Sequence, residues 1–295
     1  MSNRTRSPLG HLSGTRLGLT FLLPALVVVG AVTIYPIIYV LFTSTYQTSY
    51  LNRIRFVGGA NYLRLLSDPA AWVHFRRTAT FVVESLGFSL PLGLVLALLL
   101  NGTFPLRALF RTIIILPWVV SQLVTALLFM WLLNSQYGPV DYFLELWSVG
   151  PVEFLGDPRI AMPSLVMAAV WQSYPYPMIL ILAALQTIPR EVDEAALVDG
   201  ATGWSKFCRV TFPLIKHTVM VCAIIQSIHF FNMVTLPLVL TGGGPIDATD
   251  VVGLRVYRDA FVHFKIGPSA AGAIYMLIFN LAFSLFYLRV LHRQQ

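Results

Sequence analysis

Residues 191–215 read EVDEAALVDGATGWSKFCRVTFPLI, and this polar stretch interrupts a chain that is apolar for most of its length. Its first part, 191–198, consists of good helix formers with three acidic residues near the start, where acids suit the positive end of a helix dipole. Gly200 follows where a helix end needs a left-handed residue. Residues 204–210 predict a second short helix, which Pro213 is expected to end. The stretch therefore predicts a helix, a glycine turn, a second helix and a proline break, all outside the membrane.

The composition of the whole chain indicates a protein that crosses the membrane several times. Of its 295 residues, 57% are hydrophobic and 11% are charged, and the mean hydropathy is +0.73. Soluble domains carry about 25% charged residues. The net charge of +7 is spread over short loops, which is typical of topology control and not of nucleic-acid binding. Cys208 and Cys222 fall in a loop and in an apolar run, so no disulfide is expected.

Six apolar runs are each long enough to cross a bilayer as a helix. The first is too long for a signal-peptide core and is expected to stay in the protein. The fourth contains WQSYPYP at 171–177, whose two prolines predict a broken helix of the kind that lines a cavity. The predicted fold is an all-α membrane protein with six transmembrane helices: a tail at 1–16, then one domain at 17–295. A polar loop at 189–217 joins the fourth and fifth spans. The predicted spans are 17–42, 78–100, 112–133, 163–188, 218–240 and 267–290.

The spacing of residues within 194–213 resembles a known family motif. The sequence EAA at 194–196 is followed after three residues by Gly200, and after nine more by VTFP at 210–213. This is similar to the EAA loop of ABC-importer permeases, EAA-x3-G-x9-I-x-L-P, with Val210 and Phe212 in place of Ile and Leu. The resemblance implies that this stretch forms a cytoplasmic coupling helix, which docks into a cleft on an ATPase.

The resemblance also implies a role for each motif residue. Glu194 would make charge-assisted hydrogen bonds to the ATPase, and the small Ala195 and Ala196 would permit close docking. Gly200 would permit the turn, and Asp199, which with Gly200 and Ala201 resembles the carbohydrate branch of the family, would belong to the same coupling surface. Pro213 would fix the exit towards the fifth span. The basic residues of the loop are expected to be solvated or to face phospholipid; they are Arg190, Lys206 and Arg209.

Two further segments resemble the carbohydrate branch of that family. FVGGANY at 56–62 is similar to an external loop of sugar permeases, and LTGGGP at 240–245 to a signature of maltose-type permeases. Those glycines are not followed by Lys and Ser or Thr, so they do not predict a nucleotide site. The resemblance implies a permease subunit of an ATP-driven sugar importer and not an enzyme. We expect it in a bacterial or archaeal cytoplasmic membrane.

The same resemblance implies a set of partners. They are a second permease, two ATPase subunits that hold ATP and magnesium, an extracytoplasmic substrate-binding protein, and a sugar. The chain itself is expected to bind no cofactor, metal or nucleic acid. Its Lys and Arg residues are divided almost evenly between the two sides of the membrane, so they barely decide the orientation. The EAA resemblance does decide it, with both termini cytoplasmic.

Polar and aromatic side chains inside the predicted spans are candidates for contact with a sugar. In the fifth span Gln226, His229 and Asn232 recur at i, i+3 and i+6, on one face of a helix. In the second span Glu84 is an ionisable group at membrane depth. Alternatively, such polar groups hold neighbouring helices together, and Glu84 is hydrated near the interface. The remaining candidates lie in the fourth span: Trp171, Gln172, Tyr174 and Tyr176.

Other functions stay open on the sequence alone. The substrate could be a disaccharide or oligosaccharide, a polyol or glycerol phosphate, although a phosphate would need cations that the spans hardly offer beyond His229. A stand-alone secondary transporter would use Glu84 and His229 as proton carriers. An intramembrane enzyme is disfavoured because paired catalytic motifs are absent from the sequence.

Overall fold

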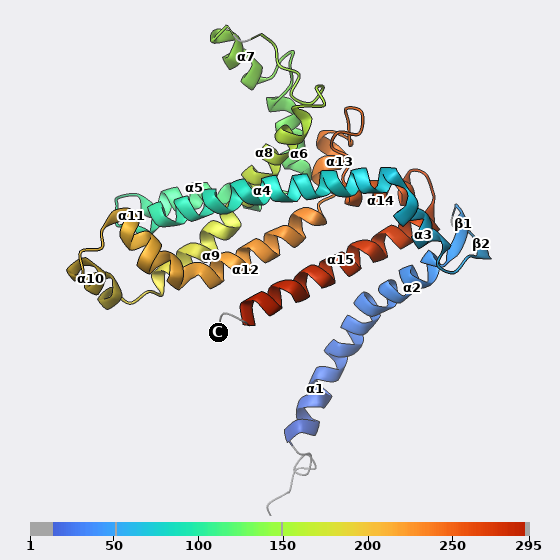
Figure 1. Ribbon diagram of the computed structural model, residues 1–295, viewed down its shortest axis with the longest axis horizontal. Coiled ribbons are helices and arrows are strands. Elements are labelled where there is room, and N and C mark those ends of the chain that lie inside the picture. The colour runs from blue at the N-terminus through green and yellow to red at the C-terminus, as the bar shows by residue number, and fades with distance from the viewer. Residues whose placement is uncertain (1–13, 51, 149, 293–295) are drawn as a thin grey trace, which may run out of the picture.

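The computed structural model describes residues 14–50, 52–148 and 150–292, and these are mostly α-helical (Figure 1). The all-α prediction is confirmed, apart from one antiparallel two-stranded ribbon. The α-helices are α1 (Gly14–Val29), α2 (Tyr35–Ser44), α3 (Ala60–Ser67), α4 (Pro69–Asn101), α5 (Arg107–Val119), α6 (Gln122–Leu132), α7 (Pro139–Leu146), α8 (Ala161–Ser173), α9 (Pro175–Gln186), α10 (Arg190–Val198), α11 (Gly203–Lys206), α12 (Phe212–Phe231), α13 (Thr235–Leu240), α14 (Val252–Phe261) and α15 (Ile266–His292). The other elements are the strands β1 (Tyr46–Ser49) and β2 (Asn52–Phe56) and the π-helical turns η1 (Gly30–Ile34) and η2 (Phe207–Thr211).

The helices that could cross a membrane fall into two groups. Four are long and apolar enough by themselves: Phe21–Ser44, Pro69–Asn101, Gly203–Phe231 and Ile266–Tyr287. The other two are bent pairs, α5 with α6 at 97° and α8 with α9 at 41°. The described residues therefore supply four spans, or up to six if each bent pair crosses once. The break predicted in the fourth run is confirmed, because α8 and α9 meet there.

A proline near the start of α12 does not end the helix, contrary to the prediction for Pro213. One helix, Gly203–Phe231, runs through α11, η2 and α12. Proline lacks an N–H and its ring clashes with the preceding turn of an α-helix. The wider π turn avoids that clash, with the N–H of Phe212 donating to the carbonyl of Phe207. The first span uses the same device, because η1 lies directly before the turn that holds Pro36.

Two predicted spans are interrupted where the sequence predicted continuous helices. The run at 112–133 bends at Val120, whose backbone is extended, and the Ser121 hydroxyl then accepts the N–H of Val124 at the start of α6. The run at 218–240 stops at Phe231, and α13 begins only at Thr235. Neither break lies at a glycine or proline that would announce it in the sequence. At the first break the Ser121 hydroxyl caps α6, and at the second the Asn232 Nδ2 donates to the Ile228 carbonyl at the end of α12 at 2.7 Å.

The elements gather at two ends of a long bundle. Figure 1 shows α10 and α11 at one end, and α3, the β-ribbon and α14 at the other. Helix α4, with 33 residues, is about 50 Å long and runs between the two ends. Its buried side chains join two apolar clusters, one around Phe81 and Phe230 and the other around Met178 and Ile181. The polar stretch at 191–215 is thus held at the end of a packed scaffold.

Candidate functional site

Helix α10 ends in a glycine turn of the predicted kind. Gly200 has φ of +77°, a left-handed conformation that side chains disfavour. The N–H of Gly200 donates to the carbonyl of Leu197 at 3.0 Å, and the N–H of Ala201 donates to that of Ala196 at 2.9 Å. Together these bonds form a Schellman motif. Asp199 is the C-cap residue, and its N–H donates to the Ala195 carbonyl at 3.0 Å.

The two faces of α10 differ in exposure. Ala196 is buried, whereas Glu194 and Ala195 are exposed. Two apolar side chains at its C-terminal end also lie in the open: Leu197 is 55% exposed and Val198 is 87% exposed. Contiguous exposed apolar surface that is rimmed by polar groups marks sites of contact with other proteins. Of the two alanines in the EAA motif, only Ala195 can reach such a partner directly.

An ion pair holds α10 against α11. The Lys206 Nζ lies 2.8 Å from the Asp193 Oδ1. Both side chains line a depression of about 330 Å³ between this hairpin and the ends of α4 and α9. The Trp204 ring stacks on Phe207 at its rim, with the centroids 5.1 Å apart. Lys206 therefore bridges the two helices of the α10–α11 hairpin (Arg190–Lys206), and is not the solvated or lipid-facing residue that the sequence predicted.

The fifth span connects this hairpin to the middle of the bundle. The elements α11, η2 and α12 form one continuous helix, Gly203–Phe231. On α12, Gln226 is buried and its Nε2 donates to the Ser173 carbonyl at 2.9 Å. The residue that would normally donate to that carbonyl is Pro177, which has no N–H. The Ser89 hydroxyl of α4 donates to the Gln226 Oε1 at 2.7 Å, so the nitrogen and the oxygen of this amide are both hydrogen-bonded.

Gln172 performs the equivalent task at the bend of the third span. Its Nε2 donates at 2.8 Å to the carbonyl of Val120, where α5 and α6 separate. Tyr174 donates its hydroxyl to the Ile114 carbonyl at 3.3 Å. The Trp171 ring packs on Phe129, and Tyr176 lies beside Trp118. Most of these predicted sugar contacts are thus engaged in joining spans, which is the alternative that the sequence left open.

Three predicted path residues stay more accessible. Asn232 is exposed at the C-terminal end of α12, and it exchanges hydrogen bonds of 3.1 and 3.4 Å with Asn280 of α15. His229 is exposed, and Glu84 is half-buried on α4. Within the described residues Glu84 makes no hydrogen bond or ion pair. Asn280 was missed by the sequence analysis, because it stands alone in an apolar run without a motif.

Among the residues that the structure describes, no group of three or more His, Cys, Asp or Glu side chains is arranged to hold a metal ion. The site offers hydrogen bonds, one ion pair and exposed apolar side chains.

Comparison with known proteins gives consistent matches. Residues 89–294 match the family model described as binding-protein-dependent transport system inner membrane component. The chain is 34% identical over 294 residues to the trehalose/maltose transport system permease protein MalF of Thermococcus litoralis, covering 98% of each chain. It is 31% identical to the sn-glycerol-3-phosphate transport system permease protein UgpA of Agrobacterium fabrum, covering 81% of this chain and 82% of the relative.

Among solved structures, the chain is similar to part of a bacterial alginate ABC transporter, solved in complex with an alginate pentasaccharide-bound periplasmic protein. The TM-score is 0.81 at 25% identity, and the match covers 92% of both chains.

Proposed function

The chain belongs to the family of binding-protein-dependent transport system inner membrane components, as a permease of the sugar ABC importer type, and from this premise we propose that it pairs with a second permease to form a translocation path. We propose further that an ATPase drives this path, and the observation that carries this part of the proposal is the α10–α11 hairpin. Its first helix, α10, exposes Glu194 and Val198. Its second helix, α11, is the start of the long helix that continues to the middle of the bundle.

In this proposal α10 docks into an ATPase subunit. Glu194 makes charge-assisted hydrogen bonds there, and Ala195 with Leu197 and Val198 supplies the apolar contact. Ala196 and Asp199 keep the helix and its turn in shape, since Ala196 is buried and Asp199 is the C-cap. Two such ATPase subunits bind ATP and magnesium, and this chain binds no nucleotide itself.

Closure of the ATPase pair then moves the spans. The hairpin shifts as a unit because Lys206 ties α10 to α11. The continuous helix carries the shift to Gln226, which acts on the break between α8 and α9 through the Ser173 carbonyl. Broken helices form the substrate site of many transporters, and whole bundles of helices rock against each other around that site. The translocation path thereby opens alternately to the two sides of the membrane.

The proposal also sets the orientation of the chain. The α10–α11 end faces the cytoplasm, and the end with α3, the β-ribbon and α14 faces outward, where a substrate-binding protein delivers the sugar. Six crossings then leave both termini in the cytoplasm of a bacterium or archaeon. An extracytoplasmic delivery partner fits the similarity to the alginate transporter, which was solved with a periplasmic protein.

For the substrate we propose a neutral sugar. Asn232 is an exposed amide on the fifth span that bonds the Ile228 carbonyl and Asn280. A sugar hydroxyl that reaches its exposed side exchanges with these bonds, because an amide both donates and accepts hydrogen bonds. A glycerol phosphate is the second candidate, because one relative is a permease for sn-glycerol-3-phosphate. A phosphate would need a cation on the path, where His229 is the nearest candidate.

Reconstitution tests this function. The tagged chain is purified from native membranes with the subunits that accompany it and is placed in proteoliposomes. We expect ATP hydrolysis that rises with a sugar-loaded binding protein, and sugar accumulation only when ATP is present. Uptake driven by a pH gradient without ATP would instead favour a secondary transporter that uses Glu84 and His229.

A further inference from the structure

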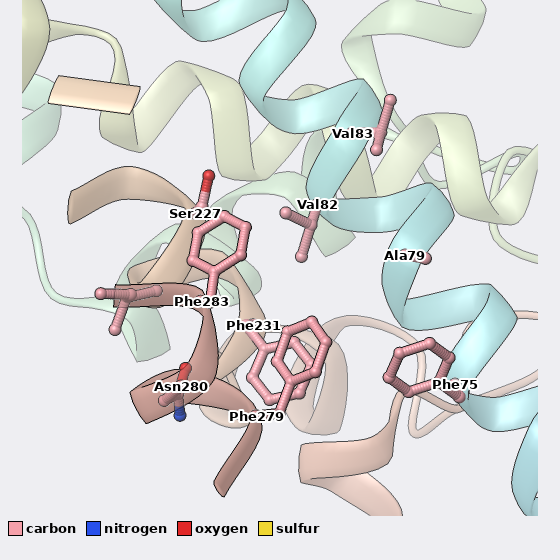
Figure 2. Close-up of a pocket in the computed structure, with 10 residues that line it drawn as sticks. Phe75, Ala79, Val82, Val83, Ser227, Phe231, Phe279, Asn280 and Phe283 are labelled. Carbon is pink, nitrogen blue, oxygen red and sulfur yellow. The ribbon is translucent and has the colours of Figure 1, made fainter. Parts of the chain in front are cut away.

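A partly open cavity lies between α4, α12 and α15, away from the α10–α11 hairpin. Its volume is about 160 Å³. Figure 2 shows Phe231 and Phe279 lying together at one side of it, with Phe75 on α4 turned towards them. Most of its lining is aromatic or aliphatic, and only Ser227 and Asn280 carry polar side chains.

Neither polar side chain is available to a sugar. The Ser227 hydroxyl donates to the carbonyl of Ala223 at 2.7 Å within its own helix. The Asn280 amide is bonded to Asn232. A sugar buried here would lose hydrogen bonds to water without replacement, which is costly. An apolar cavity of this size stays dry and takes apolar ligands instead, so the chemistry of the lining selects a hydrocarbon.

The outer wall of the cavity opens to the side of the bundle. Ala79 and Val83 of α4 line it, and Val83 is 68% exposed. Trp72 and Arg76 stand on the same face of α4, at the helical spacing i, i+4, i+7 and i+11. Trp72 is 56% exposed, and Arg76 is exposed too. Tryptophan is enriched at the level of lipid headgroups, and an arginine near a helix end reaches up to them.

Arg76 has no acidic partner on this chain. Among the residues that the structure describes, no carboxylate oxygen lies within 4.0 Å of its guanidinium. The face therefore presents an unpaired cation beside the headgroup layer and a carbon-lined cavity one to two turns deeper. This order of polarity is that of a phospholipid with a negative headgroup.

We propose that the cavity holds part of one acyl chain of an anionic phospholipid whose headgroup phosphate contacts Arg76. The lipid wedges between α4 and α15 and stabilises their packing on α12. A helix of a second permease could cover the same face. We favour lipid, because a helix placed there would have to supply its own carboxylate opposite Arg76. This site is independent of the substrate and of the ATPase.

The test loads the delipidated full transporter with equal amounts of phosphatidylglycerol and phosphatidylcholine and counts the retained lipid by native mass spectrometry. We expect one retained phosphatidylglycerol for each copy of this chain. Ala79→Phe fills the cavity mouth and should lower retention about tenfold, because several methylene groups lose their burial. Arg76→Gln should keep the acyl contact and lose the preference for phosphatidylglycerol. The matched controls, Arg64→Gln on α3 and Val95→Phe lower on α4, should retain lipid as the wild type does.

Two results would overturn the proposal. One is equal retention by Ala79→Phe and by the wild type. The other is a photo-crosslink to a second permease chain in native membranes, from a benzophenone maleimide attached at Ala79→Cys in a chain whose exposed Cys208 is replaced by Ser, which would make this face a subunit interface. Val83→Trp is a second blocking variant, used in case Ala79→Phe misfolds. It fills the same cavity mouth from a more exposed position. Both blocking variants must elute as the intact complex before retention is compared.

Discussion

The side-chain amide of Gln226 on α12 donates a 2.9 Å hydrogen bond to the backbone carbonyl of Ser173, at the break between α8 and α9. This carbonyl has no backbone donor within its own helix, because Pro177, four residues later, has no N–H. One side chain of the fifth span thus completes the backbone bonding of the fourth. The same helix begins at the α10–α11 hairpin, so the break and the hairpin lie on one mechanical connection.

Replacing Gln226 tests that connection. Gln226→Met keeps the volume but leaves the Ser173 carbonyl without its donor and the Ser89 hydroxyl without its acceptor. Buried hydrogen bonds between membrane helices contribute about 0.6 kcal/mol on average and up to about 1.7. We expect a lower unfolding midpoint and less sugar transported for each ATP hydrolysed. Gln186→Met, at an exposed position on α9, is the control. An unchanged ratio of transport to hydrolysis in Gln226→Met would remove this residue from the coupling route.

The ion pair between Lys206 and Asp193 should affect coupling more than folding. Partly exposed pairs contribute only about 0.2–1 kcal/mol to stability, so Lys206→Met should fold normally. We expect its ATP hydrolysis to continue while sugar transport falls, because α10 then moves without α11. Exchanging the charges, Lys206→Asp with Asp193→Lys, should restore transport. Arg209→Met is the control on the same loop, and a failure of the exchanged pair to recover would count against a linking role.

The glycines at 242–243 offer a matched pair of substitutions. Both have positive φ, +58° at Gly242 and +84° at Gly243. A Cβ on Gly243 would lie 2.9 Å from the Arg258 Nη1 and 3.3 Å from the Asp250 Oδ1, whereas one on Gly242 meets only a carbonyl at 3.9 Å. We expect Gly243→Ala to lower the unfolding midpoint clearly more than Gly242→Ala, which carries only the backbone strain of about 1–2 kcal/mol. Thermal unfolding of both purified variants measures the difference, and equal losses would contradict the crowding at Gly243.

Asp250 makes stability depend on pH. Its side chain is 0% exposed, with the His74 Nδ1 at 3.5 Å and the Arg258 Nη1 at 3.6 Å. Burial raises the pKa of the Asp250 carboxyl above its ordinary value of 3.8, although His74 and Arg258 act in the opposite direction. The folded protein then holds this proton more tightly than the unfolded chain does. The resulting stability is full below about pH 3.8 and is lost as the pH rises through the folded pKa.

Asp250→Asn should therefore flatten the pH dependence of the unfolding midpoint above about pH 4. The measurement is a series of thermal unfolding curves beside the wild type, with Glu145→Gln on α7 as an exposed control. A pH dependence in Asp250→Asn as steep as in the wild type would show that other groups cause it.

What the sequence predicted well was local. The hairpin at 190–206 follows from helix formers, early acids and one glycine, and each of these acts within a few residues. The break near Tyr174 follows from two prolines. The bend at Val120 could not be predicted, because the donor that satisfies its carbonyl, Gln172, lies 52 residues away. The partnership of Asn232 with Asn280 spans 48 residues and could not be predicted for the same reason. The π turn that carries the helix through Pro213 leaves no mark in the hydrophobic pattern.

The docking of α10 is tested most directly by the ratio of sugar transported to ATP hydrolysed in Glu194→Lys, beside Glu145→Lys as a matched reversal at the exposed α7. Purified transporter in proteoliposomes supplies both rates, and co-purification supplies the amount of ATPase. We predict that Glu194→Lys lowers the transport ratio or loses the ATPase, while Glu145→Lys does neither. A Glu194→Lys transporter with wild-type ATPase content and a wild-type ratio would contradict the proposal that α10 couples this chain to an ATPase.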